Sequence, residues 1–395
     1  MSTSVPPDLF SHDPGGVPDP DLDPDIELLD LVLGNLEQRG AEVQGNDVVV
    51  ARGRRFDADD VEAALQAATS AAERPFRTSS RRPLLEAAGI RVLSLRDWSR
   101  EDELLWRMSV RDELQRYDGL VSPQWLRGRG VYNGGQGIYV DKRRTQVLAS
   151  TGMAVSVLST GRHYSDQSGH EQMIYSFPMT RRSPGRDRSE IDAVTALLGA
   201  RMPLFVIENV GQLRRVRLAW VTAADDAAQS FLLEFASRPP APLVVEPDPG
   251  RPFVRTTRRT RRAATTNRVH RDAGFTFRVL HRYGARCAIS GIPVKEVLDA
   301  AHVIPVADGG PDDERNGILL SATLHRAFDA GLWALNPATR AIELDPRVRP
   351  DDLRLVTLRL RPDAPYPHDE ALTWRYQQFR HKAQSEAGAR SQAGV

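Results

Sequence analysis

The segment Asp299-Ala-Ala-His302-Val-Ile-Pro305 sets a single histidine in a run of apolar residues. A short apolar run that ends at a proline predicts a β-strand, and His302 would project from it. Residues 307–311 include two consecutive glycines and predict a loop. Asn316 then precedes Gly-Ile-Leu-Leu, which predicts a second strand. We therefore expect a hairpin with His302 on its first strand and Asn316 just before its second.

A helix is expected directly after this hairpin. Ser321 belongs to a residue type that commonly caps helices, and a helical run follows it. His325 lies within the first two turns of this run and is expected to face the strand pair. Asp329 follows His325 by one turn.

Three of these side chains suit the hydrolysis of a phosphodiester bond. A neutral imidazole at His302 can take a proton from an attacking water near neutral pH. The amide of Asn316 can tie down the loop backbone and so orient His302. The imidazole of His325 can hold a divalent metal ion, which would stabilise the developing phosphorane charge and the leaving oxygen. We predict catalytic roles for His302 and Asn316 and a metal-ligand role for His325.

The order His302, Asn316, His325 resembles that of the HNH nucleases. The interval between the last two residues, and the segment Arg326-Ala-Phe-Asp329-Ala-Gly-Leu, resemble one branch of that family. The resemblance implies a ββα-metal fold, in which a two-stranded hairpin and a helix surround one divalent metal. It also implies that the chain is an endodeoxyribonuclease that uses Mg²⁺, Mn²⁺ or a similar ion.

The sequence departs from the family pattern beside the expected base. Many HNH proteins carry Asp or His at this position as a second metal ligand, whereas this chain carries Ala301. The ligand must then come from Asp299 or Asp329. Strand alternation would place Asp299 on the opposite face from His302 unless a bulge intervenes. Asp329 shares a helix face with His325, so we rank it slightly above Asp299, although that branch usually has an acid at the Asp299 position.

A second departure concerns zinc. Many relatives brace the hairpin with two Cys-x-x-Cys pairs, and the corresponding segments here are Cys287-Ala-Ile-Ser290 and Ser321-Ala-Thr-Leu324. A single cysteine cannot build a tetrathiolate site. We therefore expect hydrophobic packing in place of structural zinc.

Positive charge is concentrated before the nuclease segment. The net charge of the chain is only +1, yet eleven arginines and one acid, Asp272, lie between Arg251 and Arg286. A solvated linker is the simpler interpretation, and a phosphate-binding arm is the one we favour because the segment adjoins the hairpin. Each neutralised phosphate would steepen the salt dependence of binding by about 0.9 in log-log slope. The predicted DNA-binding residues are Arg258, Arg259, Arg261, Arg262 and Arg268.

Composition limits the setting in which the protein acts. A chain of 395 residues suggests two or three domains, and 41% hydrophobic residues are enough for substantial cores. No apolar run is long enough to span a bilayer, and the amino terminus lacks the pattern of a signal peptide. One cysteine is consistent with a reducing compartment. We expect a cytoplasmic protein that does not interact with membranes.

The chain is expected to be an α+β protein of several domains. Residues 25–118 show helical periodicity, with segments at 61–72 and 101–117 and a short hairpin at 41–50. Breakers around 238–250 separate the middle of the chain from the basic segment. After the hairpin we expect strands at 341–344 and 353–360 and a final helix at 368–384. The expected parts are a disordered tail at 1–24, a helical region at 25–118, a β-rich domain at 119–237, a linker at 238–270, the nuclease domain at 271–385 and a flexible tail at 386–395.

The middle block alternates strand-type runs with glycine turns. The runs begin near Gly137, Met153, Met173, Pro203, Arg214 and Phe231, and one helix is expected at 189–198. This pattern predicts a mixed, bent sheet or an open barrel. Segments between the strands combine aromatic, arginine and polar residues, the equipment of a pocket for a planar base on a charged strand.

The order of parts resembles bacterial modification-dependent restriction endonucleases, which join an amino-terminal SRA or PUA-like reader to a carboxy-terminal HNH domain. Gly-Val-Tyr132 and Tyr164-Ser-Asp166 look like the reader's glycine-aromatic entry and Tyr-x-Asp segment. The resemblance implies that Tyr132, Tyr164 and Asp166 form a base pocket for a flipped modified cytosine. In an alternative interpretation, these tyrosines are wall residues of a barrel.

The sequence leaves several functions open. The first is a metal-dependent endonuclease that cuts modified double-stranded DNA in defence against phage. The second is a DNA-binding protein with a decayed nuclease module, of which the missing acid at Ala301 would be the sign. The third is an HNH effector activated by a small nucleotide signal. Because each chain would carry one active site, double-strand cleavage suggests a homodimer.

Overall fold

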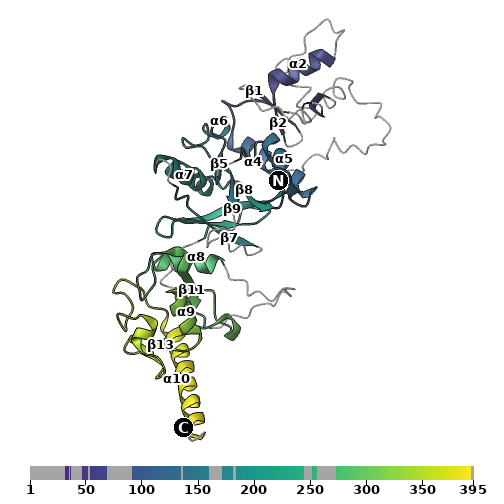
Figure 1. Ribbon diagram of the computed structural model, residues 1–395. Coiled ribbons are helices and arrows are strands. Elements are labelled where there is room, and N and C mark those ends of the chain that lie inside the picture. The colour runs from purple at the N-terminus through teal and green to yellow at the C-terminus, as the bar shows by residue number, and fades with distance from the viewer. Residues whose placement is uncertain are drawn as a thin grey trace. The chain divides into compact units, whose positions relative to one another are not determined.

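The computed structural model describes residues 32–34, 36, 47–51, 54–68, 91–134, 137–159, 171–180, 184–243, 251–255 and 273–392. The chain divides into two compact units. The first comprises Met1–Ser159 and Pro178–Trp220, and the second comprises Thr160–Phe177 and Val221–Val395. Helices and sheets occur together in both (Figure 1), which confirms the α+β class. The expected tail at 1–24 lies outside the described residues.

A small sheet lies near the amino-terminal end of the first unit. Its strand order is β2-β1-β3, with antiparallel pairs. Of the hairpin expected at 41–50, residues 41–46 lie outside the described residues, whereas 47–50 belong to a strand that pairs with residues 54–57 and 91–94. The elements are β1 (Asp47–Ala51), β2 (Arg54–Asp57), α2 (Ala58–Ala68) and β3 (Arg91–Ser94).

A larger sheet holds the strands expected in the middle of the chain. Its order is β5-β6-β8-β9-β10-β7, and β4 pairs with β9. Strands β6 and β8 are parallel. Over the described residues the sheet is an open path with β5 and β7 at its ends, so no closed barrel is formed there. The strands are β4 (Leu120–Val121), β5 (Ile138–Val140), β6 (Ala154–Ser159), β7 (Gln172–Ser176), β8 (Pro203–Val210), β9 (Leu213–Asp225) and β10 (Ser230–Glu234).

Three helices of the first unit, α4, α5 and α6, begin after a residue whose side chain caps them. Ser99 caps α4, and Asp102 completes a capping box with it. Apolar residues of α4 then enter a core that contains Trp106 and Phe205, whose rings meet edge to face at 6.5 Å. The helices are α4 (Arg100–Gln115), α5 (Pro123–Gly128), α6 (Lys142–Thr145) and α7 (Pro184–Ala200).

The same core contains a fully buried ion cluster. Glu103 bonds Arg107 at 2.8 Å and Arg144 at 2.6 Å, and all three side chains have no exposed surface. Burial alone would raise the pKa of Glu103, but Arg144 and Arg107 outweigh it and lower the pKa to about 2. The cluster therefore holds α4 and α6 together only while Glu103 is ionised.

The second unit contains the predicted hairpin and helices. The prediction of a strand at 353–360 is wrong, because these residues form no strand. Arg354 adopts a left-handed backbone conformation with φ +53°, which interrupts an extended segment, and Val356 is 98% exposed. The elements are α8 (Ala273–Arg282), η1 (Lys295–Val297), β11 (Leu298–His302), η2 (Val306–Asp308), η3 (Glu314–Asn316), β12 (Gly317–Ser321), α9 (Ala322–Asp329), β13 (Trp333–Leu335), β14 (Ile342–Leu344), η4 (Pro350–Leu353) and α10 (Asp369–Gln392).

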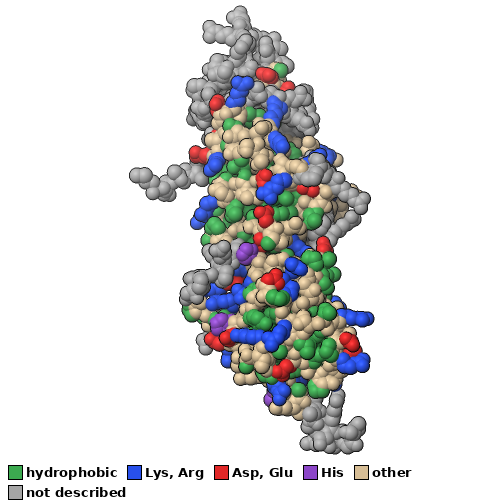
Figure 2. Space-filling view, turned by 90° about the vertical axis from the view of Figure 1, so that its left-hand side faces the viewer, with side chains coloured by type: hydrophobic (Ala, Val, Ile, Leu, Met, Phe, Trp, Pro, Cys, Tyr) green, Lys and Arg blue, Asp and Glu red, His purple; other side chains and the backbone are tan. Residues whose placement is uncertain are grey.

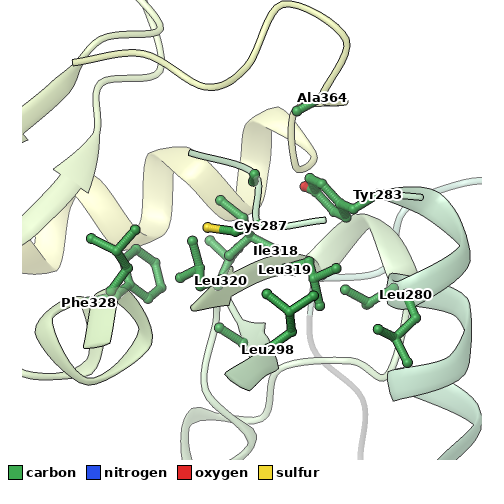
Figure 3. Close-up of a cluster of buried hydrophobic side chains, with 14 of the residues drawn as sticks. Leu280, Tyr283, Cys287, Leu298, Ile318, Leu319, Leu320, Phe328 and Ala364 are labelled. Carbon is green, nitrogen blue, oxygen red and sulfur yellow. The ribbon is translucent and has the colours of Figure 1, made fainter. Parts of the chain in front are cut away.

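One hydrophobic cluster joins most of these elements. Figure 3 shows its centre, where Leu280 of α8, Leu298 of β11 and Phe328 of α9 surround the residues of β12. The cluster also includes Ile174 of β7 and Leu232 of β10, both almost fully buried. The second unit therefore has a core to which two strands of the larger sheet contribute.

The surface of the described residues is mixed in charge. Figure 2 shows Lys and Arg side chains interspersed with Asp and Glu over the face in view, with hydrophobic side chains between them. In the part of the chain that the structure describes, no helix is both long and apolar enough to cross a membrane.

Candidate active site

The candidate site is built on the hairpin of β11 and β12. The strands pair antiparallel in regular register, with Leu298 opposite Ser321 and His302 opposite Gly317. Gly310 lies in the connecting loop, where a Cβ atom would come within 1.9 Å of the carbonyl oxygen of Ile304. The strand, loop and strand predicted around His302 are confirmed.

His302 ends the first strand, and its ring is held by the loop and by α8. Its Nε2 lies 2.9 Å from an Oδ1 atom of Asp312 in the loop. The ring of Phe275, on α8, stacks on the imidazole with centroids 3.8 Å apart and planes 13° from parallel. The side chain is 17% exposed, so the ring is restrained on one face and one edge and still has access to solvent.

Asn316 is buried and bonded to the loop backbone. Its Oδ1 accepts from the amide of Ile304 at 2.9 Å, and its Nδ2 donates to the carbonyls of Ile304 and Pro311, each at 3.0 Å. These three bonds join the end of the first strand to the far side of the loop. The geometry matches the loop-tying role expected of this amide.

His325 lies on α9 between two carboxylates. Its Nδ1 is 3.1 Å from Asp299 on β11, and its Nε2 is 3.2 Å from Asp329 one helical turn later. The two acids ranked as alternatives from the sequence therefore both contact the histidine. Asp299 is the more enclosed of the two, with its side chain 16% exposed against 58% for Asp329.

The charge of His325 follows from these partners. Burial alone would lower its pKa, but the hydrogen bonds and charges of Asp299 and Asp329 outweigh burial and raise the pKa to about 9. In the absence of a metal the imidazole is therefore protonated at neutral pH. A metal ion would have to replace that proton.

These donors fit a divalent metal in chemical type. An imidazole with carboxylates suits first-row transition metals, and carboxylates also suit Mg²⁺. Within the described ranges, no three His, Cys, Asp or Glu side chains are arranged to hold a metal as they stand. Metal binding here would require one carboxylate to exchange its bond to His325 for a bond to the ion.

Ala301 occupies the position where relatives carry an acid. Its side chain is fully buried, and the residue pairs with Ile318 across the hairpin. A carboxylate at this position would be buried in the hydrophobic core, which costs free energy unless the charge is paired. The alanine is therefore consistent with the fold and is not by itself a sign of decay.

Cys287 lies at the position of the first zinc-binding cysteine of the relatives. It is fully buried in the core of the second unit, where Figure 3 shows it near Ile318. Its Sγ accepts from the backbone amides of Ser290 at 3.4 Å and Ser321 at 3.3 Å. Ser321 is the N-cap of α9, but its side chain makes no capping bond. The cysteine thus links the start of α9 to the turn at residues 287–290.

The start of the arginine-rich segment is fixed to the loop of the site. Arg251 lies 3.0 Å from Asp313 and 3.2 Å from Glu314, and Arg315 donates to the carbonyl of Arg251 at 2.8 Å. Phe253 stacks on His368 at 4.1 Å. The predicted DNA-binding residues themselves, Arg258, Arg259, Arg261, Arg262 and Arg268, lie outside the described residues.

The predicted base pocket is described at one residue. Tyr132 is 7% exposed and belongs to the core cluster of the first unit. Tyr164 and Asp166 lie outside the described residues, so the structure does not bring the three together or separate them. The role of these residues stays a prediction.

Two contacts of His302, with Asp312 and with Phe275, were not predicted from the sequence. Asp312 directly follows residues 307–311, which we interpreted only as a loop, and Phe275 belongs to a helix twenty-seven residues before His302. An acid in the loop beside a suspected base is a signal that could have been used. The stacked phenylalanine could not be found without the tertiary packing.

Comparison with known proteins identifies the domain. Residues 287–336 match a family described as HNH endonuclease, so the chain carries an HNH endonuclease domain and is a hydrolase that cleaves DNA. Among curated proteins, none matches the sequence of this chain.

Three solved structures resemble the chain at low identity. The modification dependent TagI restriction endonuclease is 16% identical, with 65% of this chain and 90% of that chain covered and a TM-score of 0.27. KRYPTONITE in complex with mCHH DNA is 14% identical, with 38% of this chain and 43% of that chain covered and a TM-score of 0.24. The type IV phosphorothioation-dependent restriction endonuclease ScoMcrA is 13% identical, with 78% of this chain and 82% of that chain covered and a TM-score of 0.23. TM-scores this low establish no function for this chain.

Proposed function

We propose that the chain is a metal-dependent restriction endonuclease that hydrolyses modified double-stranded DNA, with His302 as the general base. Methylated or hydroxymethylated cytosine is the modification that the proposal names, and defence against phage is the role. The observation that supports the chemistry best is the setting of His302. Its ring is held by Asp312 and Phe275 beside a loop that Asn316 fixes.

His325, Asp299 and Asp329 are the residues that would hold the metal. When bound, a divalent ion supplies positive charge that stabilises the phosphorane-like transition state and the leaving oxygen. Asp299 and Asp329 each already contact His325. Because Asp299 comes from β11 and His325 from α9, their contact also fixes the helix against the strand that carries His302.

The remaining work falls to the hairpin. His302 takes a proton from water, and the oxygen of that water forms a bond to phosphorus while the bond to the leaving oxygen breaks. Asn316 keeps the loop, and with it the position of the imidazole, constant during this step. Partial exposure of His302 gives water and a phosphodiester access to the ring.

Substrate selection is assigned to two parts of the chain. The arginine-rich segment would bind backbone phosphates, and its first residues are fixed beside the loop of the active site by Arg251 and Phe253. The sequence resemblance to base-flipping readers supports the pocket of Tyr132, Tyr164 and Asp166 as the part that recognises the modified base. A homodimer would supply the second active site that double-strand cleavage needs.

Cleavage assays on matched substrates test the proposal. The protein is incubated with Mg²⁺ or Mn²⁺ and with phage DNA that carries modified cytosine, beside the same sequence without modification. We expect cutting of the modified DNA by the wild type, and a loss of about 100-fold or more in His302→Ala because a general base contributes that much. The matched control is His381→Ala, which removes an exposed histidine of α10 in the same unit.

The outcomes separate the three functions. Equal cutting of modified and unmodified DNA would contradict the recognition of modified cytosine and leave a nuclease without this selectivity. Cutting that requires an added nucleotide and ignores modification would favour the signal-activated effector. If no metal and no substrate support cutting while DNA binding persists, the chain is a binding protein with a decayed module.

A further inference from the structure

The contact between His302 and Asp312 has a consequence for the chemistry of the base. The imidazole Nε2 and the carboxylate Oδ1 are 2.9 Å apart, and both side chains are largely enclosed, at 17% and 24% exposure. We propose that Asp312 is a positioning residue that keeps the Nε2 proton on His302 and so leaves Nδ1 as the atom that accepts the proton of water. This inference rests on the proposed role of His302 as general base.

Stacking fixes the plane of the ring. Phe275 is 1% exposed and lies nearly parallel to the imidazole at 3.8 Å. Gly317, opposite His302 in the hairpin, permits this approach, because a Cβ atom there would come within 3.0 Å of Phe275 and 2.3 Å of Val279. With its plane set by Phe275, the ring still needs a contact at its edge to decide which nitrogen carries the proton.

The residues around Asp312 hold the carboxylate at that edge. Arg278, on α8 one turn after Phe275, donates to the backbone carbonyl of Asp312 at 2.8 Å. Asn316 donates to the carbonyl of the preceding residue, Pro311, at 3.0 Å. Two consecutive carbonyls are therefore bonded to fixed side chains. The backbone position of Asp312 therefore does not depend on its bond to His302.

The chemical reason is the donor and acceptor inventory of the pair. A neutral imidazole has one N–H donor and one acceptor nitrogen, and an ionised carboxylate can only accept. A carboxylate at Nε2 therefore favours the form in which Nε2 is protonated and the lone pair lies on Nδ1. When Nδ1 takes a proton from water, the resulting imidazolium is stabilised by the negative charge of Asp312, which itself stays ionised. The hydroxide oxygen bonds to phosphorus, and the leaving oxygen departs with the electron pair of the broken bond.

The tautomer can be measured without any cleavage. In protein labelled with ¹⁵N at histidine, long-range ¹H–¹⁵N correlation spectra distinguish the two neutral forms of each ring. His302→Gln identifies the signals of His302 among the nine histidines. In the wild-type protein, free of metal and DNA, we expect the neutral ring to carry its proton on Nε2. A ring protonated on Nδ1 would overturn the inference, whatever the protein is later found to cut.

Cleavage by Asp312 variants supplies the functional test. We expect Asp312→Asn and Asp312→Ala to lower the single-turnover rate by about 10- to 100-fold, as removal of partners that orient histidines commonly does. The affinity for DNA and the metal concentration for half-maximal rate should change less than about twofold. The matched control is Asp308→Asn, an exposed acid on the same loop, which should keep the wild-type rate.

The two proposals fail in different ways. An unchanged rate in both Asp312 variants, or a loss explained by weaker metal or DNA binding, would overturn the positioning role while leaving His302 as the base. A wild-type protein that cuts no substrate would overturn the proposed function, and the tautomer measurement would still decide whether Asp312 sets the proton on His302.

Discussion

Asn316 shows how one buried side chain determines the geometry of the site. Its amide satisfies one backbone donor and two backbone acceptors, and no surface of the residue is exposed. Aspartate could accept the bond from Ile304 but could not donate to the two carbonyls. The sequence predicted a loop-tying role for this residue, and the structure shows which atoms it ties.

Asn316→Ala is expected to destabilise the second unit and to slow cleavage. The change leaves the buried amide of Ile304 without its acceptor, and an unsatisfied buried group costs about 1–3 kcal/mol. The free energy of unfolding from urea titration measures the first effect, and single-turnover cleavage below the transition measures the second. If Asn316→Ala unfolded at the same urea midpoint as the wild type, the role given to these bonds would be contradicted.

At the scale of elements, the close approach of α8 to β12 depends on a glycine. The absent side chain of Gly317 leaves room for Val279 and Phe275 of α8, and Phe275 in turn contacts His302. Figure 1 shows α8 near β11 and α9 in the second unit. The sequence identified Gly317 only as the start of a strand, because nothing local indicates that a helix forty residues earlier packs there.

Gly317→Ala is expected to separate these elements. A Cβ atom 2.3 Å from Val279 forces a shift, and overpacking of this kind costs about 1–3 kcal/mol. We expect a lower midpoint in thermal unfolding and a lower cleavage rate, since Phe275 would move from the His302 ring. The control is Gly199→Ala in α7, where no atom lies within 4 Å of the added Cβ, and there the stability should be equal or slightly higher. Equal effects of both changes would contradict the packing argument.

The first unit contains an element pair whose stability depends on pH. The ordinary pKa of Glu103 near 4.5 falls to about 2 in the fold, where Arg107 and Arg144 flank it. Because the pKa of Glu103 is lower in the folded state, its ionised carboxylate contributes to the free energy of unfolding. This contribution is complete above about pH 4.5 and is lost as the pH falls towards 2.

Stability of the first unit should therefore fall by on the order of 3 kcal/mol across this window. Urea unfolding at several pH values measures it, followed by near-ultraviolet circular dichroism, since the indole of Trp98 bonds Glu103 at 2.9 Å. In Glu103→Gln the stability at pH 7 should be lower, because buried Arg107 loses its counter-charge and Arg144 keeps only that of Asp141. A wild-type protein whose stability is constant between pH 5 and pH 3 would show that Glu103 does not control it.

At the scale of the whole molecule, the core of the second unit is not confined to the nuclease segment. Ile174 of β7 and Leu232 of β10 belong to the cluster that includes Phe275 and Leu298. Polar contacts accompany this packing. Gln172 accepts from the amide of Gly274 at 3.0 Å, and Lys295 donates to the carbonyl of Ala228 at 2.7 Å.

Ile174→Ala should therefore weaken the nuclease although it lies about a hundred and thirty residues before His302 in sequence. Removal of a buried isoleucine costs about 2–5 kcal/mol. We expect the temperature at which cleavage activity is lost to fall with the thermal midpoint of the second unit. The control is Val147→Ala, at an exposed position of the first unit, which should change neither. Loss of stability without any change in the thermal inactivation of cleavage would contradict a shared core.

The sequence by itself determined the local part of the site. Apolar runs, a proline, two glycines and the spacing of His302, Asn316 and His325 were enough to predict the hairpin, the following helix and the HNH resemblance, because these features depend on neighbours along the chain. Periodicity also predicted most strands of the middle block. It failed at residues 353–360, where the apolar pattern has no partner strand.

Only the tertiary structure decided which side chains meet. It placed Asp312 and Phe275 on His302, set both Asp299 and Asp329 against His325, and buried Ala301 where relatives carry an acid. Each of these contacts joins residues from different elements, and its geometry follows from packing among helices and strands. A pattern along the chain specifies the elements. The distances that make a base or a metal site arise when those elements pack into one core.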